Sequence, residues 1–213
     1  MRVEKAFPAL LAAALVLYAA PLSPLELELG LLRLLAAPVL AGLASYTVKK
    51  KLGGKLASLL TYVGVTAPVV GFGCAILALS LVPLILVNPR VGLTAVVALA
   101  IPPALICFVY PTVFIAATGV WCWRLTGSKK PLVFAAILTA AFVFANIALV
   151  PAFLVGLDIE AARAFNVDVA ELEKIYYTSL EAHFSLEFIE LPFFVAYGVW
   201  IARKMRGEIC ERA

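Results

Sequence analysis

The sequence predicts an all-α fold, a polytopic transmembrane helical bundle with about six spans and both termini in the cytoplasm. Of its 213 residues, 64% are hydrophobic and 14% are charged, whereas soluble domains average about 45–50% apolar and about 25% charged residues. A soluble core of this size has no room for so much apolar surface. Runs of nearly uncharged residues also recur, and each is long enough to cross a bilayer as a helix.

Six apolar stretches are the expected spans, and no long Gly/Ser or Pro linker divides residues 1–213 into more than one domain. The spans cover residues 6–23, 30–48, 56–87, 92–123, 131–156 and 186–202. The first is expected to stay attached and not to be a cleaved signal, because Glu4 interrupts the basic n-region and Pro21 would follow a cut after Ala20.

The charged residues orient these spans. Thirteen of the seventeen Lys and Arg residues fall on one side of the topology, and the acidic connectors fall on the other. The basic anchors of the two internal loops are Lys49, Lys50, Lys51, Lys55, Lys129 and Lys130. Lys and Arg accumulate on the cytoplasmic side, so the predicted localisation is a cell membrane with both termini inside. The partner of these loops is expected to be the lipid bilayer and not nucleic acid, since no basic domain or stacking platform accompanies them.

The third and fourth spans exceed thirty residues, about 48 Å of helix, against ~30 Å of hydrocarbon. Each has a candidate helix break near its middle: Gly71 and Gly73 in one, Pro102 and Pro103 in the other. Interrupted helices in corresponding positions are typical of transporter sites. A kink or tilt is the simpler interpretation, because no charged residue lies near either break.

Small residues recur at four-residue spacing in two spans. They are Ala67, Gly71 and Ala75 in the third span, and Ala136 and Ala140 in the fifth. Such faces favour close helix packing, within one chain or in a homo-oligomer. Asn146 is the one amide near the centre of a span. It is a candidate ligand, although hydrogen bonding between helices is the simpler role.

The stretch "HFSLEFIELPFF", residues 183–194, contains the chemically suggestive cluster. His183, Glu187 and Glu190 fall within about 60° of arc on one helical face. Glu190 is expected near the outer hydrocarbon boundary, and the cluster is a candidate proton, cation or divalent metal site. The competing interpretation is structural: glutamates in a first helical turn are stabilised by the helix dipole, and Arg33 is within reach of them by snorkelling. No catalytic residue, cofactor or metal centre is predicted, since no HExxH or nucleophile elbow is present.

Residues 157–185 are expected to form an outer loop with a short amphipathic helix. Asp168 with Glu171 has the spacing of a capping box. Apolar residues then recur at helical intervals up to His183.

Two motifs resemble the Yip/Yif-type integral membrane domain family. They are "KLGGKLASLLTYVGVTAP", residues 51–68, and "WCWRLTGSKKPLVFAAIL", residues 121–138. The similarity covers roughly residues 30–150. The chain departs from the family in its added outer loop and sixth span, residues 157–202, and in lacking a long cytoplasmic N-terminal region. The resemblance implies a scaffolding membrane domain without catalytic residues.

Three functions follow from these observations. The first is a Yip/Yif-like, non-enzymatic scaffold that acts through helix contacts with itself or with a membrane-protein partner. The second is a small transporter or channel with an outer acidic site at Glu187 and Glu190. The third is an intramembrane enzyme or metal-binding protein that uses His183.

Overall fold

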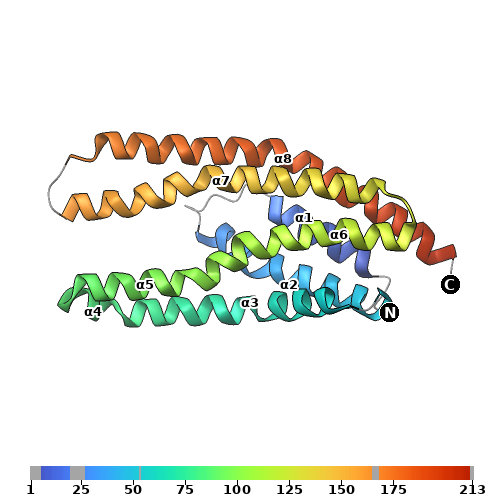
Figure 1. Cartoon of the computed structure of the whole chain (residues 1–213), viewed down its shortest axis with the longest axis horizontal. Helices are drawn as coiled ribbons and strands as arrows, with labels where there is room; N and C mark the ends of the chain where they lie inside the picture. Colours follow the sequence, from blue (N-terminus) through green and yellow to red (C-terminus); the bar gives the residue numbers. More distant parts are fainter. Residues whose placement is uncertain (1–5, 20–26, 53, 165–167, 212–213) are drawn as a thin grey trace.

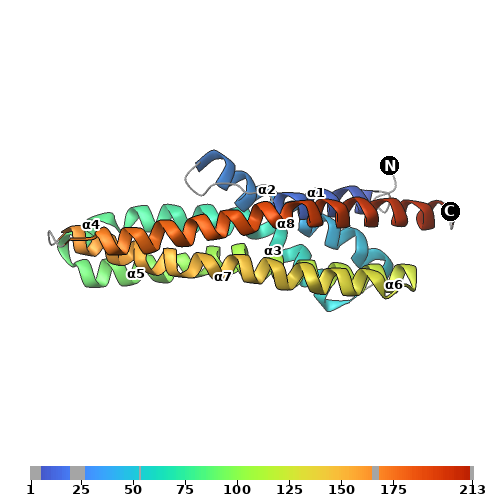
Figure 2. The ribbon, with the colours of Figure 1, turned by 90° about the horizontal axis from the view of Figure 1, so that it is seen from above.

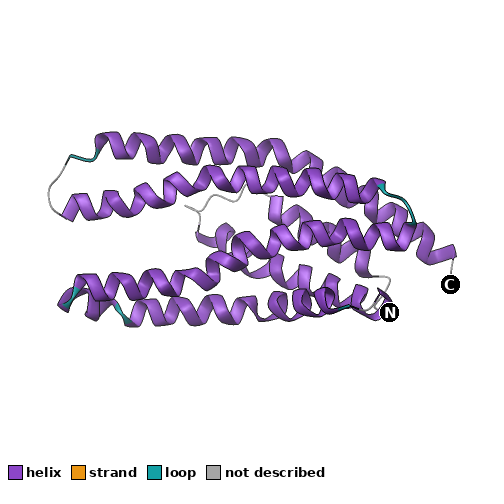
Figure 3. Ribbon diagram, in the orientation of Figure 1, coloured by secondary structure: helices purple, strands orange, loops and turns teal. Residues whose placement is uncertain are grey.

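The computed structural model describes residues 6–19, 27–52, 54–164 and 168–211, and these residues form helices joined by short connectors. The elements are α1 (Phe7–Ala19), α2 (Leu27–Leu52), α3 (Lys55–Ser80), α4 (Val82–Val87), α5 (Pro89–Ala104), the π-helical turn η2 (Leu105–Val109), α6 (Tyr110–Thr126), α7 (Lys130–Ala164) and α8 (Ala170–Glu211). No strand occurs in this described part (Figure 3). The all-helical class predicted from composition is therefore confirmed.

Four helical stretches are long and apolar enough to cross a membrane. They are Lys55–Val87, Thr94–Thr126, Lys130–Ala148 and Ala170–Lys204, and the helices Phe7–Ala19 and Leu35–Lys49 are apolar but shorter. Each of the six expected spans overlaps one of these segments, and four of the segments are long enough to cross a membrane.

The helices run lengthwise, and the connectors that the structure describes gather at two ends (Figures 1 and 2). The start of α1, the α2–α3 turn, the α6–α7 turn and the end of α8 share one end, on the right in Figure 1. We call it the basic end, after its described cations: Lys49, Lys55, Arg124, Lys129, Lys130, Arg203 and Lys204. Lys50 and Lys51 belong to the same turn, but their side chains lie outside the described part. The helix α4 and the outer ends of α7 and α8 form the opposite, far end.

Glycines close both turns at the basic end. Gly54 has φ 112° and Gly127 has φ 68°, conformations that residues with a Cβ rarely adopt. Gly127 also donates its N–H to the Trp123 carbonyl at 2.7 Å and so ends α6. This explains the glycine that both basic loops contain.

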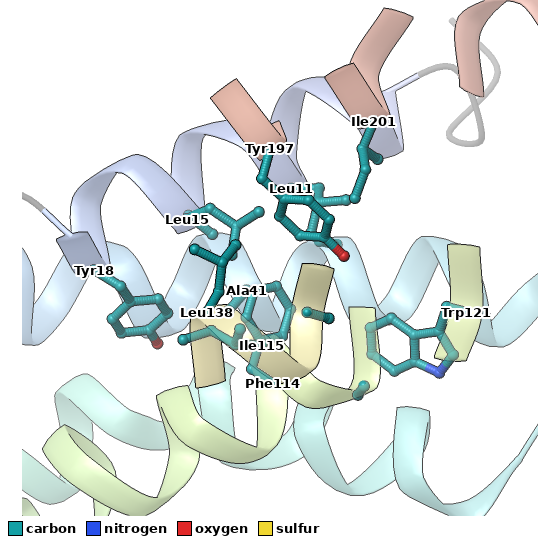
Figure 4. Close-up of a cluster of buried hydrophobic side chains, with 14 of the residues drawn as sticks. Leu11, Leu15, Tyr18, Ala41, Phe114, Ile115, Trp121, Leu138, Tyr197 and Ile201 are labelled. Carbon is teal, nitrogen blue, oxygen red and sulfur yellow. The ribbon is translucent and has the colours of Figure 1, made fainter. Parts of the chain in front are cut away.

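The apolar core lies in the half of the molecule nearest the basic end. Leu11 and Leu15 of α1 face Tyr197 and Ile201 of α8, above Phe114 of α6 (Figure 4). The helix α1 therefore supplies buried side chains to the core of the bundle.

A close three-helix junction fixes α2, α3 and α6 together. A Cβ on Gly64 of α3 would overlap the Tyr110 hydroxyl and the Pro38 carbonyl, and would lie 2.8 Å from the Gly42 Cα. Tyr110 donates its hydroxyl to the Leu60 carbonyl at 2.9 Å. The sequence stripe based on Ala67, Gly71 and Ala75 is not this junction: Ala67 is buried, Gly71 is half-buried and Ala75 is exposed.

The candidate helix breaks behave differently from each other. The helix α3 continues through Gly71 and Gly73, and its interruption comes later, at Leu81. A lone glycine weakens a helix by only about 1 kcal/mol, and every backbone N–H is kept. Pro102 and Pro103 lie in the last turn of α5, directly before η2. Each proline removes one helical N–H, and the wider π turn follows.

The described residues of the outer loop expected at 157–185 contain more helix than the one short amphipathic helix predicted there. The helix α7 runs to Ala164, and α8 is continuous from Ala170 through the stretch in which two separate helices were expected. Asp168 lies at the start of α8 as expected, but its Oδ1 accepts a hydrogen bond from the Ala170 N–H at 3.1 Å and not from the Glu171 N–H of a capping box. The charged residues at 158–181 made this stretch resemble a loop in the sequence, because exposed helix surfaces and loops are both rich in polar residues.

Candidate functional site

The buried face of α8 contains three successive ionisable side chains. Its buried positions alternate at intervals of three and four residues, the spacing of a coiled-coil seam. The seam residues are Leu180, His183, Glu187, Glu190, Phe194, Tyr197 and Ile201. The exposed fractions are 4% for His183, 2% for Glu187 and 7% for Glu190. The structure therefore places these three residues on one face, as their spacing predicted, and encloses them.

Helix α7 forms the opposite wall of this seam. Its buried positions follow the same alternating interval: Pro131, Ala135, Leu138, Phe142 and Ala145. The small side chain of Ala145 lets the imidazole of His183 approach the α7 backbone. His183 Nδ1 lies 2.9 Å from the Ala145 carbonyl oxygen.

This contact fixes the tautomer of His183. A carbonyl oxygen only accepts hydrogen bonds, so Nδ1 carries the hydrogen. Nε2 is left to face Glu187, with 3.4 Å between Nε2 and Oε1. When the pair gains one proton, it becomes either imidazolium with carboxylate or imidazole with carboxylic acid. The arrangement is thus a buried proton-binding pair, and Glu190 follows it in the next seam position.

The remaining ligand candidates do not join this pair. Asn146 is half-buried, and its Nδ2 donates to the Phe142 carbonyl within α7 at 2.7 Å. Arg33 lies in α2, and its side chain is outside the part of the chain that the structure describes. Among the described residues, no three His, Cys, Asp or Glu side chains are grouped closely enough to share a metal ion.

A second buried polar contact, which the sequence analysis did not single out, joins α6, α7 and α8 nearer the basic end. The Tyr197 hydroxyl donates to the Pro131 carbonyl at 3.2 Å and lies 3.3 Å from Thr118 Oγ1. Pro131 lies in the first turn of α7, and its carbonyl is within reach of a side chain on α8. The signal that could have found this contact is the seam spacing, since Tyr197 lies seven residues after Glu190.

Comparisons with known proteins find no match for this chain among family models, curated proteins or solved structures. The resemblance to Yip/Yif-type domains stays a prediction. The site itself therefore carries the functional argument.

Proposed function

We propose that this chain is a multi-pass membrane protein that moves protons across the bilayer through the His183–Glu187–Glu190 segment of α8. The observation that carries the proposal is the burial of three ionisable side chains in successive seam positions of a helix apolar enough to cross a membrane. Enclosing such groups at membrane depth is unfavourable, and they typically mark ion or proton pathways. His183 and Glu187 supply a site on which a proton can rest.

The topology that we propose has six passes with the basic end in the cytoplasm. The support is that both internal basic turns, the start of α1 and the end of α8 share one end (Figure 1). Outside the seam, the acidic residues whose side chains the structure describes lie toward the far end: Asp168 just before α8, and Glu171, Glu173 and Glu181 on it. This separation is what the preference of Lys and Arg for cytoplasmic loops produces.

The position of Trp200 near the basic end supports a depth for the site. Lys204 Nζ lies 5.8 Å from the centre of the Trp200 ring, a pairing suited to the headgroup region. Glu190 lies ten residues from Trp200, about 15 Å along the helix. This is half of the ~30 Å hydrocarbon thickness. In this placement Glu190 is at the bilayer centre, deeper than the outer boundary expected from the sequence, because α8 extends well beyond both sides of the expected span.

The first prediction concerns proton movement in liposomes loaded with a pH-sensitive dye. Glu187→Gln is expected to slow dye acidification under an imposed pH gradient by about tenfold or more, because an amide cannot take up the proton. Glu181→Gln is the matched control, since Glu181 is exposed on the same helix. Equal rates for the two variants and the parent chain would contradict the proposal.

A second candidate function is the scaffold that the resemblance implies. The observation that favours it is the pair Ala136 and Ala140, which are exposed on α7 at four-residue spacing and would allow another helix to approach closely. Ala140→Leu is expected to shift the mass of the detergent-solubilised complex from oligomer to monomer in native mass spectrometry. Ile137→Leu, at another exposed position of α7, is the control. A parent chain that is monomeric and carries no bound membrane protein would exclude this candidate.

A further inference from the structure

Two helical hairpins share the far end of the bundle but differ in polarity. Residues 69–104, which we call the apolar arm, comprise the outer part of α3 with α4 and α5, and contain one charged residue, Arg90. The α7–α8 hairpin reaches the same end (Figures 1 and 2) and contains eight charged residues between 155 and 182. The composition of the apolar arm favours the hydrocarbon core of a membrane, and that of the α7–α8 hairpin favours contact with water.

The surface of the apolar arm is not covered by the rest of the chain. Among its residues whose side chains the structure describes, only Gly92 is buried. Its large apolar side chains are exposed, with exposed fractions of 73% for Val69, 71% for Leu79 and 80% for Leu86. The main packing of α5 is against α3, α4 and η2. An exposed apolar surface of this extent needs a partner outside the chain.

The helical stretch that carries one side of the arm is too long to stand upright in a bilayer. The 33 residues Lys55–Val87 extend about 50 Å as a helix, against ~30 Å of hydrocarbon. An upright arm would place roughly 20 Å of apolar helix in water. A straight helix of this length would fit only at a tilt of about 53°, beyond the range of roughly 0–40° seen for membrane helices. A bend at the base of the arm removes this conflict.

Both long helical segments of the hairpin have a weak point at the same level. The Tyr110–Leu60 hydrogen bond fixes the base of the hairpin. Pro68 lies eight residues beyond Leu60, and Pro102 lies eight residues beyond Tyr110. Each proline removes a helical hydrogen bond, and η2 adds a π turn beside Pro102. Such positions are where helices bend.

We propose that lipid acyl chains are the partner of the apolar arm: the arm bends at Pro68 and η2 and lies tilted within the bilayer, while the α7–α8 hairpin extends into water. Asn88, which is exposed at the tip, then lies at the level of the outer headgroups. The inference rests on the membrane placement in the proposed function, but it does not depend on proton movement.

The test compares the depth of spin labels on single cysteines in a cysteine-free background reconstituted into phospholipid vesicles. Leu79 lies 24 residues from Lys55, and Thr178 lies 26 residues from Lys204, so the two are at similar height in an upright bundle. A label at Leu79→Cys is expected to be several-fold more accessible to oxygen than to a water-soluble nickel chelate, and a label at Thr178→Cys the reverse. A label at Leu59→Cys, in the half of α3 nearest the basic end, tests whether the bundle lies in the membrane at all.

The hinge is tested by the distance between labels at positions 79 and 178, measured by pulsed electron resonance in bilayers of different thickness. The distance distribution is expected to shift with lipid chain length, and Pro68→Ala with Pro102→Ala and Pro103→Ala should remove the shift. Pro192→Ala, in the continuous helix α8, is the control that should keep it.

Three results would overturn the inference. A nickel-accessible label at position 79, with position 59 in hydrocarbon, would mean that the arm stands in water. Dipolar coupling between labels at position 79 of two different chains would identify a second copy as the partner, if dilution with unlabelled protein abolishes that coupling. A distance that is insensitive to lipid thickness would exclude the hinge. A label at position 59 in water would instead refute the membrane placement.

Discussion

Gly64→Ala is expected to lower the free energy of unfolding by about 3 kcal/mol or more, which is the upper part of the range for overpacked cores. A methyl group there would overlap the Pro38 carbonyl and the Tyr110 hydroxyl and press on the Gly42 Cα. Two of these three contacts are backbone atoms, which cannot move aside as a flexible side chain can. For a chain of this size the midpoint of thermal unfolding in detergent should fall by roughly 6–12 °C.

Gly73→Ala is the matched control, because it lies in the same helix and nothing is within 4 Å of the position of its Cβ. Alanine is favoured over glycine in a helix interior by about 1 kcal/mol, so this variant should unfold at the same temperature or slightly higher. Similar midpoints for the two variants would contradict the close approach of α2, α3 and α6.

The helical class and the positions of the apolar segments could be predicted from the sequence because they depend on local composition. Each of the six expected spans overlaps a helix, although 56–87 and 92–123 each cover more than one element, and the two glycine turns were visible as "LGG" and "LTG". The junction at Gly64 could not be predicted, because it depends on which helices approach each other. The stripe Ala67, Gly71 and Ala75 had the better spacing pattern, yet Ala75 is exposed.

The candidate site was predictable in part for the same reason. The helical period placed His183, Glu187 and Glu190 on one face, and the structure buries all three. The sequence did not predict the partner of His183, since the Ala145 carbonyl is 38 positions away and a backbone atom has no residue signature. Nor did it predict that α8 continues from Ala170 through this stretch, because the surrounding charges made a continuous helix look like a loop.

A double-mutant cycle on His183 and Glu187 should show whether the pair stabilises the fold or is retained for function. His183→Leu or Glu187→Leu alone is expected to lower the free energy of unfolding by about 2–4 kcal/mol, because each leaves a buried polar group without the partner seen here. The double variant should return to within about 1 kcal/mol of the parent chain, since leucine suits seam positions and both polar groups are gone.

The matched cycle uses Glu181→Leu and Ser185→Leu, which have the same four-residue spacing on the exposed face of α8. Its coupling energy should be close to zero, because neither side chain is enclosed. Losses at His183 and Glu187 that simply add would mean that the two groups do not interact in the folded chain. A double variant that folds as stably as the parent but no longer moves protons would separate the two roles. The seam would then hold its ionisable residues for transport, because leucine would serve the fold equally well.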